Sequence, residues 1–214
     1  MDALAWSGGK DAALALRELE DPLLLCVLAG GRTRGHRLLP ELIRAQADAL
    51  GLRVAFVDLP ENPSNDAYEQ GLADAFGEHD IDRIAYADLF VEPIREYREG
   101  LLARCGVEGV WPLWGRDTEA LFDEFVAEYR AVACVVDDSL GPAFLGRELS
   151  PDFRADLPPD ADPCGENGEY HTFVTDGPGF AEALSVEVGD THREHNDHTG
   201  RHQHYADLRL PQPF

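Results

Sequence analysis

The feature that most constrains the fold is a regular alternation of short apolar segments and helix-periodic segments over the first two-thirds of the chain. Leu23–Ala29 is a continuous apolar run, as expected of a strand buried on both faces. Leu38–Leu50 has apolar residues at helical spacing and is followed by Gly51, which suits a helix C-terminal cap. Strands that alternate with helices in this way predict an α/β fold, with a Rossmann-like parallel sheet and helices on both faces. The other expected strands are Ala3–Trp6, Val54–Leu59, Arg83–Ala87, Val110–Leu113 and Ala131–Asp137, and the other expected helices are Asp11–Leu19, Asn65–Phe76, Pro93–Arg104 and Thr118–Tyr129.

The pattern changes after about Asp138. Gly, Pro and Asp become frequent through residues 146–168, and the helical periodicity stops. Three later segments, Tyr170–Val174, Ala183–Val188 and Tyr205–Leu210, have the composition of strands. We therefore expect a nucleotide-type α/β domain at residues 1–138 and a smaller, mixed C-terminal domain at residues 139–214.

The segment Ser7-Gly8-Gly9-Lys10-Asp11 lies between the first expected strand and the first expected helix. Ligands of open parallel sheets bind at this edge, outside the carboxyl ends of the strands. Two glycines allow the backbone to bend tightly and to bring its N–H groups close to an anion. The segment therefore predicts a site for the phosphates of ATP, with Ser7 adding a hydroxyl and Lys10 a mobile positive charge.

Two familiar phosphate-binding motifs do not fit this segment. A Walker A loop would need Gly and Ser or Thr where the chain has Leu4 and Asp11, and the dinucleotide pattern G-x-G-x-x-G is absent. An ordinary Gly-Gly turn between a strand and a helix remains the alternative to a phosphate site.

Composition adds an independent signal for Lys10. The chain has 41 acidic and 18 basic residues, a net charge of −23, and Lys10 is its single lysine. A compact ammonium fits a tight phosphate site in a way that a planar guanidinium does not. The acidic surface is typical of a protein adapted to a salty cytoplasm, and it argues against a nucleic-acid partner, which needs a basic surface.

Cysteine usage and hydropathy set the expected compartment. The four cysteines are widely spaced and form no C-x-x-C pair, so neither a disulfide framework nor a cysteine-built metal site is expected. No apolar run reaches the roughly 18–20 residues of a membrane span, and the N-terminus lacks the pattern of a signal peptide. We expect a cytoplasmic protein with no membrane partner.

The glycine segment resembles the pyrophosphate loop (PP-loop) of the N-type ATP pyrophosphatases, although Ala12 stands where that loop commonly has Ser. Further matches follow in order: Ala87-Asp88-Leu89-Phe90, Arg95 with Glu99, Pro112–Thr118 and Asp162–Val174. Together, over residues 3–180, they resemble the diphthine–ammonia ligase (diphthamide synthetase) family, in particular its prokaryotic members.

The resemblance implies an adenine nucleotide alpha hydrolase-like domain followed by a smaller domain that helps to form the substrate pocket. It implies that ATP and ammonia convert the diphthine carboxylate of elongation factor 2, or a related acceptor, into an amide, with AMP and pyrophosphate as products. It also implies that Asp88, Arg95, Trp114, Gly115, Asn167 and Gly168 belong to the nucleotide site.

Amide formation by this route requires attack of the carboxylate on the α-phosphorus, so the protein mainly positions groups and stabilises charge. We assign the loop amides, Ser7 and Lys10 to the β- and γ-phosphates. Asp11 is the expected ligand of Mg²⁺ or of its water molecules. The alternative for Asp11 is an acid in the first helical turn that interacts with the helix dipole.

The segment Gly165–Thr172 is the second expected part of the site. Strand alternation places Glu169, His171 and Phe173 on one face, where Glu169 and His171, with Glu166 just before them, could orient ammonia, remove its proton or hold a second metal. A capped turn with surface acids is the alternative.

Arg116 follows Trp114-Gly115 on the ligand side of the sheet, where it would bind the α-phosphate or the substrate carboxylate. An ion pair within the protein is its alternative. Trp114 is expected either to pack in the core or to stack on a base. For Asp88, contacts to ribose or substrate and a role as a helix cap stay open.

Five histidines gather near the C-terminus, at His192, His195, His198, His202 and His204. We expect a polar surface loop there, with divalent metal binding as the alternative. Two other functions are considered for the whole chain: a PP-loop enzyme that acts on a different carboxylate, and a regulator that binds ATP without turnover. A tRNA-thiolating or lysidine-forming enzyme would need a basic surface and, often, paired cysteines, and this sequence has neither.

Overall fold

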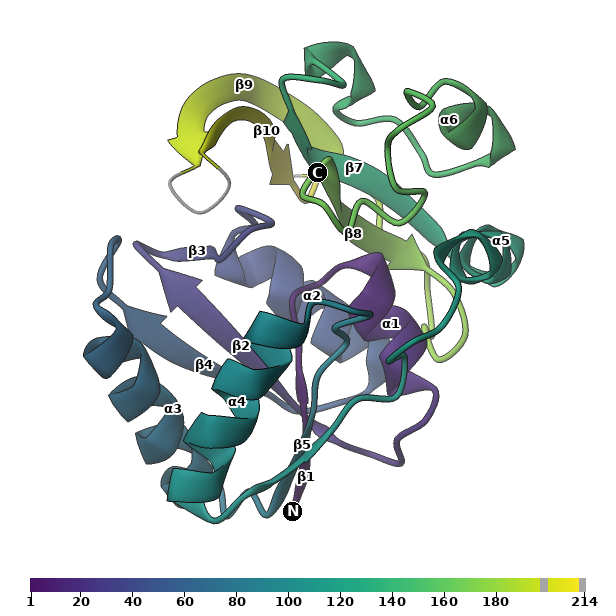
Figure 1. Ribbon diagram of the computed structural model, residues 1–214. Coiled ribbons are helices and arrows are strands. Elements are labelled where there is room, and N and C mark those ends of the chain that lie inside the picture. Colours follow the sequence, from purple (N-terminus) through teal and green to yellow (C-terminus); the bar gives the residue numbers. More distant parts are fainter. Residues whose placement is uncertain (197–199, 212–214) are drawn as a thin grey trace.

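A computed structural model describes residues 1–196 and 200–211 (Figure 1). Its larger sheet has the strands β1 (Asp2–Ala5), β2 (Leu23–Ala29), β3 (Arg32–Thr33), β4 (Val54–Leu59), β5 (Arg83–Ala85) and β6 (Glu108–Val110). The strands β4-β2-β1-β5-β6 are parallel and neighbours in that order, while β3 is antiparallel to β2. The helices of this part are α1 (Lys10–Leu16), α2 (Pro40–Leu50), α3 (Asn65–Glu78), α4 (Glu92–Cys105) and α5 (Thr118–Glu128).

Alternating side chains of β2 explain why both faces of the sheet are covered. Leu23 and Leu25 join a core formed with α3 and α4, which lie side by side along one face of the sheet (Figure 1). Leu24, Cys26 and Leu28 join the other core, with α1, α2 and α5. The expected α/β fold, with a mostly parallel sheet between helices, is confirmed.

The short strand β3 pairs with the part of β2 that β1 does not reach. β1 pairs with the first half of β2, at Leu23–Leu25, and β3 pairs with its end, at Leu28 and Ala29. On its other side β2 is occupied by β4 along residues 24–29. β3 therefore continues the sheet beyond the end of β1, and the turn that follows β3 lies next to the glycine segment.

The C-terminal region forms a smaller antiparallel sheet in the order β8-β7-β10-β9, from β7 (Arg130–Asp137), β8 (Tyr170–Asp176), β9 (Glu187–Asn196) and β10 (Arg201–Arg209). A 3₁₀ turn (Pro142–Phe144) and the short helix α6 (Pro151–Ala155) lie between β7 and β8. Buried residues of β7 and β8 share one apolar core with α1 and α2, so these two helices connect the larger sheet to the smaller one (Figure 1).

One strand belongs to a different sheet than its sequence indicates. Alternation assigned Ala131–Asp137 to the parallel sheet, but β7 pairs antiparallel with β8 and β10. A fully apolar strand indicates burial on both faces and does not tell which partners bury it. The change of sheet thus falls before Arg130 instead of near residue 138, and the division into two domains stays a proposal.

The tail is not the surface loop that its composition indicated. His192 and His195 lie on β9, His202 and His204 lie on β10, and His198 is outside the described residues. The expected strand Ala183–Val188 begins only at Glu187. Among the residues that the structure describes, no helix is long and apolar enough to cross a membrane.

Candidate functional site

The glycine segment connects β1 to α1, where the two glycines are needed for different reasons. Gly8 has φ of +83°, a conformation that L side chains rarely adopt. Gly9 has φ of −96°, but a Cβ there would lie 2.4 Å from Nε2 of His36. Gly8 is therefore required by backbone conformation, and Gly9 by the close approach of a side chain.

A fully buried glutamine on α2 holds this segment in place. The Gln46 side-chain amide donates to the carbonyls of Gly8 (3.0 Å) and Val174 (2.7 Å), and its oxygen accepts from Nε1 of Trp6 (3.0 Å). The backbone N–H of Val174 also donates to the Gly8 carbonyl, at 3.0 Å. The loop is thus joined to β1, α2 and β8, and its shape exists before any ligand binds.

Lys10 is buried at the base of the loop, with 3% of the residue exposed. Its Nζ donates to both carboxylate oxygens of Asp11 at 2.7 Å and lies 5.7 Å from the ring centre of Tyr170. Burial is the largest single influence and lowers the pKa of Lys10. The Asp11 carboxylate, together with Cys164, Tyr170 and Glu166, outweighs burial and keeps the pKa above the ordinary value. Lys10 is therefore a charged group, and it could exchange its partner Asp11 for a phosphate.

The segment before β8 lies against this loop. The Thr172 hydroxyl accepts the backbone N–H of Lys10 at 3.0 Å, at the start of α1, where the N-cap residue Gly9 offers no side chain. Tyr170 is buried and its hydroxyl donates to the Pro163 carbonyl. The two segments matched most specifically in the sequence are thus brought together across about 160 residues.

A cavity of about 340 Å³ lies between these segments. It is lined on the loop side by Ser7, Lys10 and Asp11, on the β8 side by Glu166, Gly168, Tyr170, His171 and Thr172, and on the remaining sides by residues that include Arg34, His36, Tyr86, Asp88 and Arg98. We call it the loop cavity.

A second cavity of about 630 Å³ adjoins it, and among the described residues that line it there is no carboxylate, lysine or histidine. The two share Ala5, Ser7, Arg34, Ile94 and Arg98 as lining residues. The walls of the second cavity include Leu25, Val27, Tyr68, Pro93 and Tyr97, and we call it the apolar cavity. A charged site thus opens beside a site lined by aliphatic and aromatic side chains.

The protonation of Glu166 is perturbed at this site. Burial raises its pKa to about 8, and the nearby Asp11 carboxylate adds to the effect, while Lys10 opposes it. A carboxyl group of this kind carries a proton over much of the neutral range. It is therefore suited to proton transfer close to neutral pH.

Two histidines line the loop cavity together with Glu166. The rings of His36 and His171 are in contact, with centres 4.6 Å apart. Burial and, to a smaller extent, the charge of Lys10 lower the pKa of His171 to about 4. Both rings are neutral near pH 7, since burial, the neighbouring ring and Lys10 also lower the pKa of His36 despite the opposing backbone carbonyl of Arg34.

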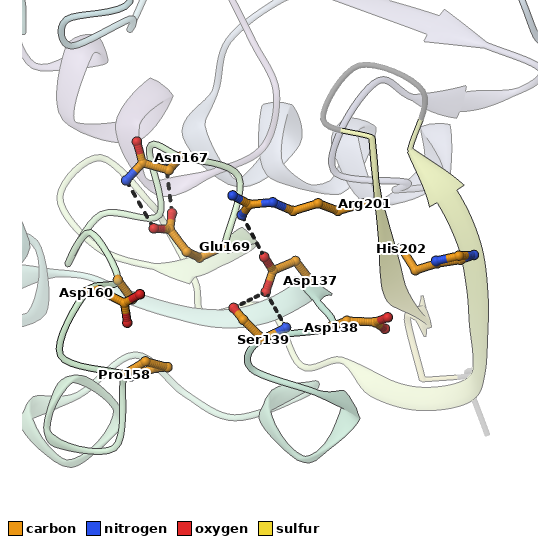
Figure 2. Close-up of a pocket in the computed structure, with 10 residues that line it drawn as sticks. Asp137, Asp138, Ser139, Pro158, Asp160, Asn167, Glu169, Arg201 and His202 are labelled. Atoms are coloured by element: carbon orange, nitrogen blue, oxygen red, sulfur yellow. Dashed lines mark hydrogen bonds and ion pairs between the residues drawn. The ribbon is translucent and has the colours of Figure 1, made fainter.

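Other residues of the predicted site lie farther from the loop. Glu169 is buried, and its carboxylate accepts the N–H of Asp162 (2.9 Å) and both the backbone and side-chain N–H of Asn167 (3.0 and 3.1 Å). Glu169 and Asn167 line a different, acidic cavity of about 610 Å³ together with Asp137, Asp138 and Asp160 (Figure 2). Glu169 thus fixes the turn that carries Glu166. Gly168, unlike its neighbours Asn167 and Glu169, lines the loop cavity.

The residues around Trp114 form ion pairs, cation–π contacts and hydrogen bonds with neighbouring residues of the protein. Arg116 donates to Glu124 at 2.6 Å and is half-exposed, which is the ion pair considered as its alternative. The Arg95 guanidinium lies 4.7 Å from the ring centres of both Trp111 and Trp114. Gly115, with φ of +75°, forms a turn whose N–H donates to Leu89. None of these four residues, Arg95, Trp114, Gly115 and Arg116, lines the loop cavity or the apolar cavity among the described residues.

Asp88 does lie at the loop cavity, but it already has partners. Its carboxylate accepts from a terminal N–H of Arg98 (3.1 Å) and from Nε1 of Trp111 (3.2 Å). The Arg98 guanidinium also covers the ring of Tyr86, 4.0 Å from its centre. Asp88 therefore holds Arg98 at the boundary between the loop cavity and the apolar cavity.

Three residues of the site were missed by sequence reasoning. Gln46 belongs to the buried stripe of α2, Arg98 to an exposed-looking helix, and His36 to a turn with no clear periodicity. A buried glutamine among the apolar positions of α2 was the one available signal. His36 lies close to the loop because β3 places the following turn there. β3 has only two residues, which is too short to be recognised as a strand from the sequence.

A parallel sheet whose first strand ends in a Ser-Gly-Gly-Lys-Asp loop, with a buried lysine facing a cavity, defines the class of PP-loop nucleotide-binding proteins. Two family models cover most of the chain: the diphthamide synthase N-terminal domain matches residues 1–109 and the diphthamide synthase C-terminal domain matches residues 117–205. The chain belongs to the diphthamide synthase family, a family of PP-loop, ATP-dependent ligases.

The other comparisons add little. No curated protein matches the chain. Among solved structures, it is similar to one described as a predicted subunit of tRNA methyltransferase from Methanocaldococcus jannaschii, with 19% identity over 73% of this chain and 85% of that chain and a TM-score of 0.42. At that level of similarity the match says nothing about activity.

Replacing Glu166 with Gln should stabilise the metal-free and nucleotide-free protein in a pH-dependent way. An unfolded glutamate loses its proton near pH 4.5, whereas folded Glu166 keeps it to about pH 8, so wild-type stability falls as the pH rises between these values. The variant lacks this loss, and we expect it to be more stable than wild type by roughly 1–3 kcal/mol at pH 8, since one pH unit corresponds to about 1.4 kcal/mol.

Urea unfolding of both proteins at pH 5 and pH 8 measures the effect. The difference between variant and wild type should be clearly larger at pH 8 than at pH 5. Glu182→Gln, at an exposed position, is the matched control and should show no such change. A difference in unfolding free energy between Glu166→Gln and wild type that is the same at both pH values would contradict the raised pKa of Glu166.

Proposed function

We propose that this protein is an ATP-dependent amide ligase that adenylates a carboxylate and amidates it with ammonia, releasing AMP and pyrophosphate. The observation that carries the proposal is that the Lys10–Asp11 pair lines the loop cavity together with Glu166, whose pKa is raised to about 8. Family membership supports ATP as the co-substrate. The acceptor we propose is the diphthine carboxylate of elongation factor 2, or a related carboxylate.

The two adjoining cavities suit the two ends of ATP. The triphosphate fits the loop cavity, where Ser7, the loop amides and Lys10 are donors. The adenosine fits the apolar cavity, whose aliphatic and aromatic walls include Val27 and Tyr97. Arg98, on the wall that both cavities share, is placed for the α-phosphate that joins these two parts.

Asp11 fits the role of a magnesium ligand. Its carboxylate is a quarter exposed, lines the loop cavity and forms an ion pair with Lys10 Nζ. No group of three or more His, Cys, Asp or Glu side chains among residues 1–196 and 200–211 could hold a metal by itself. A Mg²⁺ ion that takes most ligands from phosphate and water needs only one or two carboxylates, and it would neutralise phosphate charge when bound.

The chemistry then proceeds in two steps. A carboxylate oxygen of the acceptor attacks the α-phosphorus, forms an acyl-adenylate and expels pyrophosphate, while Lys10 and the loop amides stabilise the charge of that leaving group. Ammonia next attacks the acyl carbon, loses a proton, and AMP departs with the former carboxylate oxygen.

Proton removal from the attacking nitrogen falls to Glu166 and His171, which both line the loop cavity. Glu166, with its pKa near 8, can accept a proton in its ionised form at slightly alkaline pH. His171, neutral near pH 7, is a second acceptor at the same cavity. Glu169 supports the reaction indirectly, because it fixes the turn before these residues.

Product analysis tests the proposal. The protein is incubated with ATP, Mg²⁺, ammonium and candidate acceptors, including elongation factor 2 that carries diphthine. AMP and pyrophosphate are the expected products, and formation of ADP and phosphate would exclude α-phosphate attack. ATP binding without turnover for any acceptor would favour a nucleotide-binding regulator.

A further inference from the structure

The turn after β3, at residues 34–38, forms one wall of the loop cavity. Arg34 and His36 line that cavity, and Arg34 also lines the apolar cavity. A displacement of this turn would therefore change the shape of both cavities. The contacts that fix the turn thus matter for nucleotide binding at the proposed site.

The turn has its own hydrogen bonds, but its backbone conformation is costly. The N–H of Arg37 donates to the Thr33 carbonyl at 3.1 Å, and the N–H of Leu38 donates to Oγ1 of Thr33 at 3.0 Å. Arg37 has φ of +60°, which is uncommon for a residue that carries a side chain. A turn of this kind keeps its shape when the surrounding structure supports it.

The support comes from the C-terminal hairpin of β9 and β10, which contacts β3 and the turn (Figure 1). Arg32 pairs with the buried Asp207 of β10 at 2.8 Å, and Arg37 pairs with Glu194 of β9 at 3.0 Å. The guanidinium groups of Arg32 and Arg37 lie 5.6 and 5.1 Å from the ring centre of Tyr205, within the range of a cation–π interaction. We call these five residues the hairpin contact.

The hairpin side of this contact is itself held in place. The ring of His192 stacks on that of Tyr205, with centres 4.8 Å apart, and Nε2 of His192 lies 3.0 Å from a carboxylate oxygen of Asp207. Gln203 is buried and donates to a carboxylate oxygen of Glu194 at 2.7 Å. The hairpin side chains are therefore already ordered where they meet the two arginines, so little further side-chain entropy is lost.

The hairpin contact differs from an ordinary surface ion pair. The side chains of Arg32 and Arg37 are only 23% and 22% exposed, so their ion pairs are less screened by salt than pairs at the open surface. The buried Nε of Arg37 makes no hydrogen bond within the described part of the chain. Arg37 is therefore kept at the contact although one of its polar atoms is unsatisfied there, at a cost in free energy.

We propose that Tyr205 is a positioning residue of the nucleotide site, which acts through Arg32 and Arg37 to hold residues 34–38 at the wall of the loop cavity. The proposal rests on the proposed ATP site. Tyr205 is not among the described residues that line the loop cavity or the apolar cavity, so its effect on a nucleotide is indirect. The C-terminal region thus shapes the site in two places, through the segment before β8 and through this hairpin.

Four substitutions separate the hairpin contact from a general loss of packing. Tyr205→Leu removes the aromatic ring, whereas Tyr205→Phe keeps it. Arg37→Met removes the ion pair between turn and hairpin. Arg193→Met is its matched control, because it removes an ion pair of the same hairpin, with Asp138, that does not involve the turn. Backbone amide hydrogen exchange of residues 33–38 is measured by mass spectrometry for each nucleotide-free protein, and ATP binding is measured by calorimetry with Mg²⁺.

We expect amide exchange of residues 33–38 to become about tenfold faster in Tyr205→Leu and Arg37→Met, because the turn opens more easily without the hairpin contact. Exchange in Tyr205→Phe and Arg193→Met should stay within about twofold of wild type, since both keep the ring and the ion pairs of the turn. ATP affinity should fall about fivefold in the first two variants and stay unchanged in the other two.

Unchanged exchange of residues 33–38 in Tyr205→Leu, or equally fast exchange in Tyr205→Leu and Tyr205→Phe, would overturn the positioning role of the ring. Faster exchange of the turn with unchanged ATP affinity would overturn its link to the nucleotide site. Wild-type protein that fails to bind ATP would instead overturn the proposed function, while the exchange measurement still decides whether the hairpin holds the turn. Thermal unfolding identifies a variant that has lost its fold, and if Tyr205→Leu does not fold, Arg37→Met provides the same test.

Discussion

Replacing Lys10 with Arg should reduce turnover by about 100-fold or more, although charge is conserved. Lys10 is almost fully buried, and its Nζ lies between Asp11 and the ring of Tyr170. A planar guanidinium is larger and cannot adopt that position without displacing Tyr170 or the loop. A misplaced donor to the leaving pyrophosphate typically costs 10²–10³ in rate. Steady-state release of pyrophosphate measures the effect.

Arg17→Lys is the matched control, because it makes the reverse exchange at a partly exposed ion pair with Glu124. We expect it to retain wild-type turnover, since exposed pairs of this kind contribute little. Near-normal activity of Lys10→Arg would show that any cation suffices at this position, and that the single lysine of the chain has no special role.

Replacing Gln46 with Leu should destabilise the protein by roughly 3 kcal/mol and weaken ATP binding. The substitution conserves bulk but leaves the Trp6 N–H and the Val174 carbonyl without a partner in the core, each at a cost of roughly 1–3 kcal/mol. The Gly8 carbonyl keeps only the backbone N–H of Val174. Urea unfolding and ATP calorimetry give the two readouts.

Gln70→Leu provides the comparison, since Gln70 lies on α3 and bonds only to exposed Asp74. Its stability should change by less than about 0.5 kcal/mol, as is usual at surface positions. A stability loss for Gln46→Leu no larger than that of Gln70→Leu would contradict the role of Gln46 in holding the loop.

Much of the fold follows from local pattern. The two-faced apolar strand β2, the Gly51 cap of α2 and the spacing of strands and helices predict the parallel sheet and its ligand edge. The sequence pattern gave wrong predictions where the pairing partner of a strand decides which sheet it joins. Residues 131–136 of β7 are as apolar as β2, yet β7 pairs in the antiparallel sheet. The polar, histidine-rich tail forms strands because β10 pairs with β7.

The candidate site shows the same difference between what local sequence predicts and what depends on contacts in the folded chain. Lys10, Asp11 and Glu166 were proposed from motifs, and the structure brings them to one cavity. Glu169 and Arg116, proposed from the same segments, are bound to Asn167 and Glu124. Which carboxylate of a turn faces the cavity depends on hydrogen bonds within that turn, and a sequence motif does not contain that information.

Transfer of an oxygen atom is the measurement that tests the central claim most directly. An acceptor that supports turnover is labelled with ¹⁸O in its carboxylate and incubated with ATP, Mg²⁺ and ammonium, and the products are analysed by mass spectrometry. If the carboxylate attacks the α-phosphorus at the Lys10 loop, one ¹⁸O atom appears in AMP and none in pyrophosphate. Label in inorganic phosphate, or unlabelled AMP beside an amide product, would contradict formation of an acyl-adenylate.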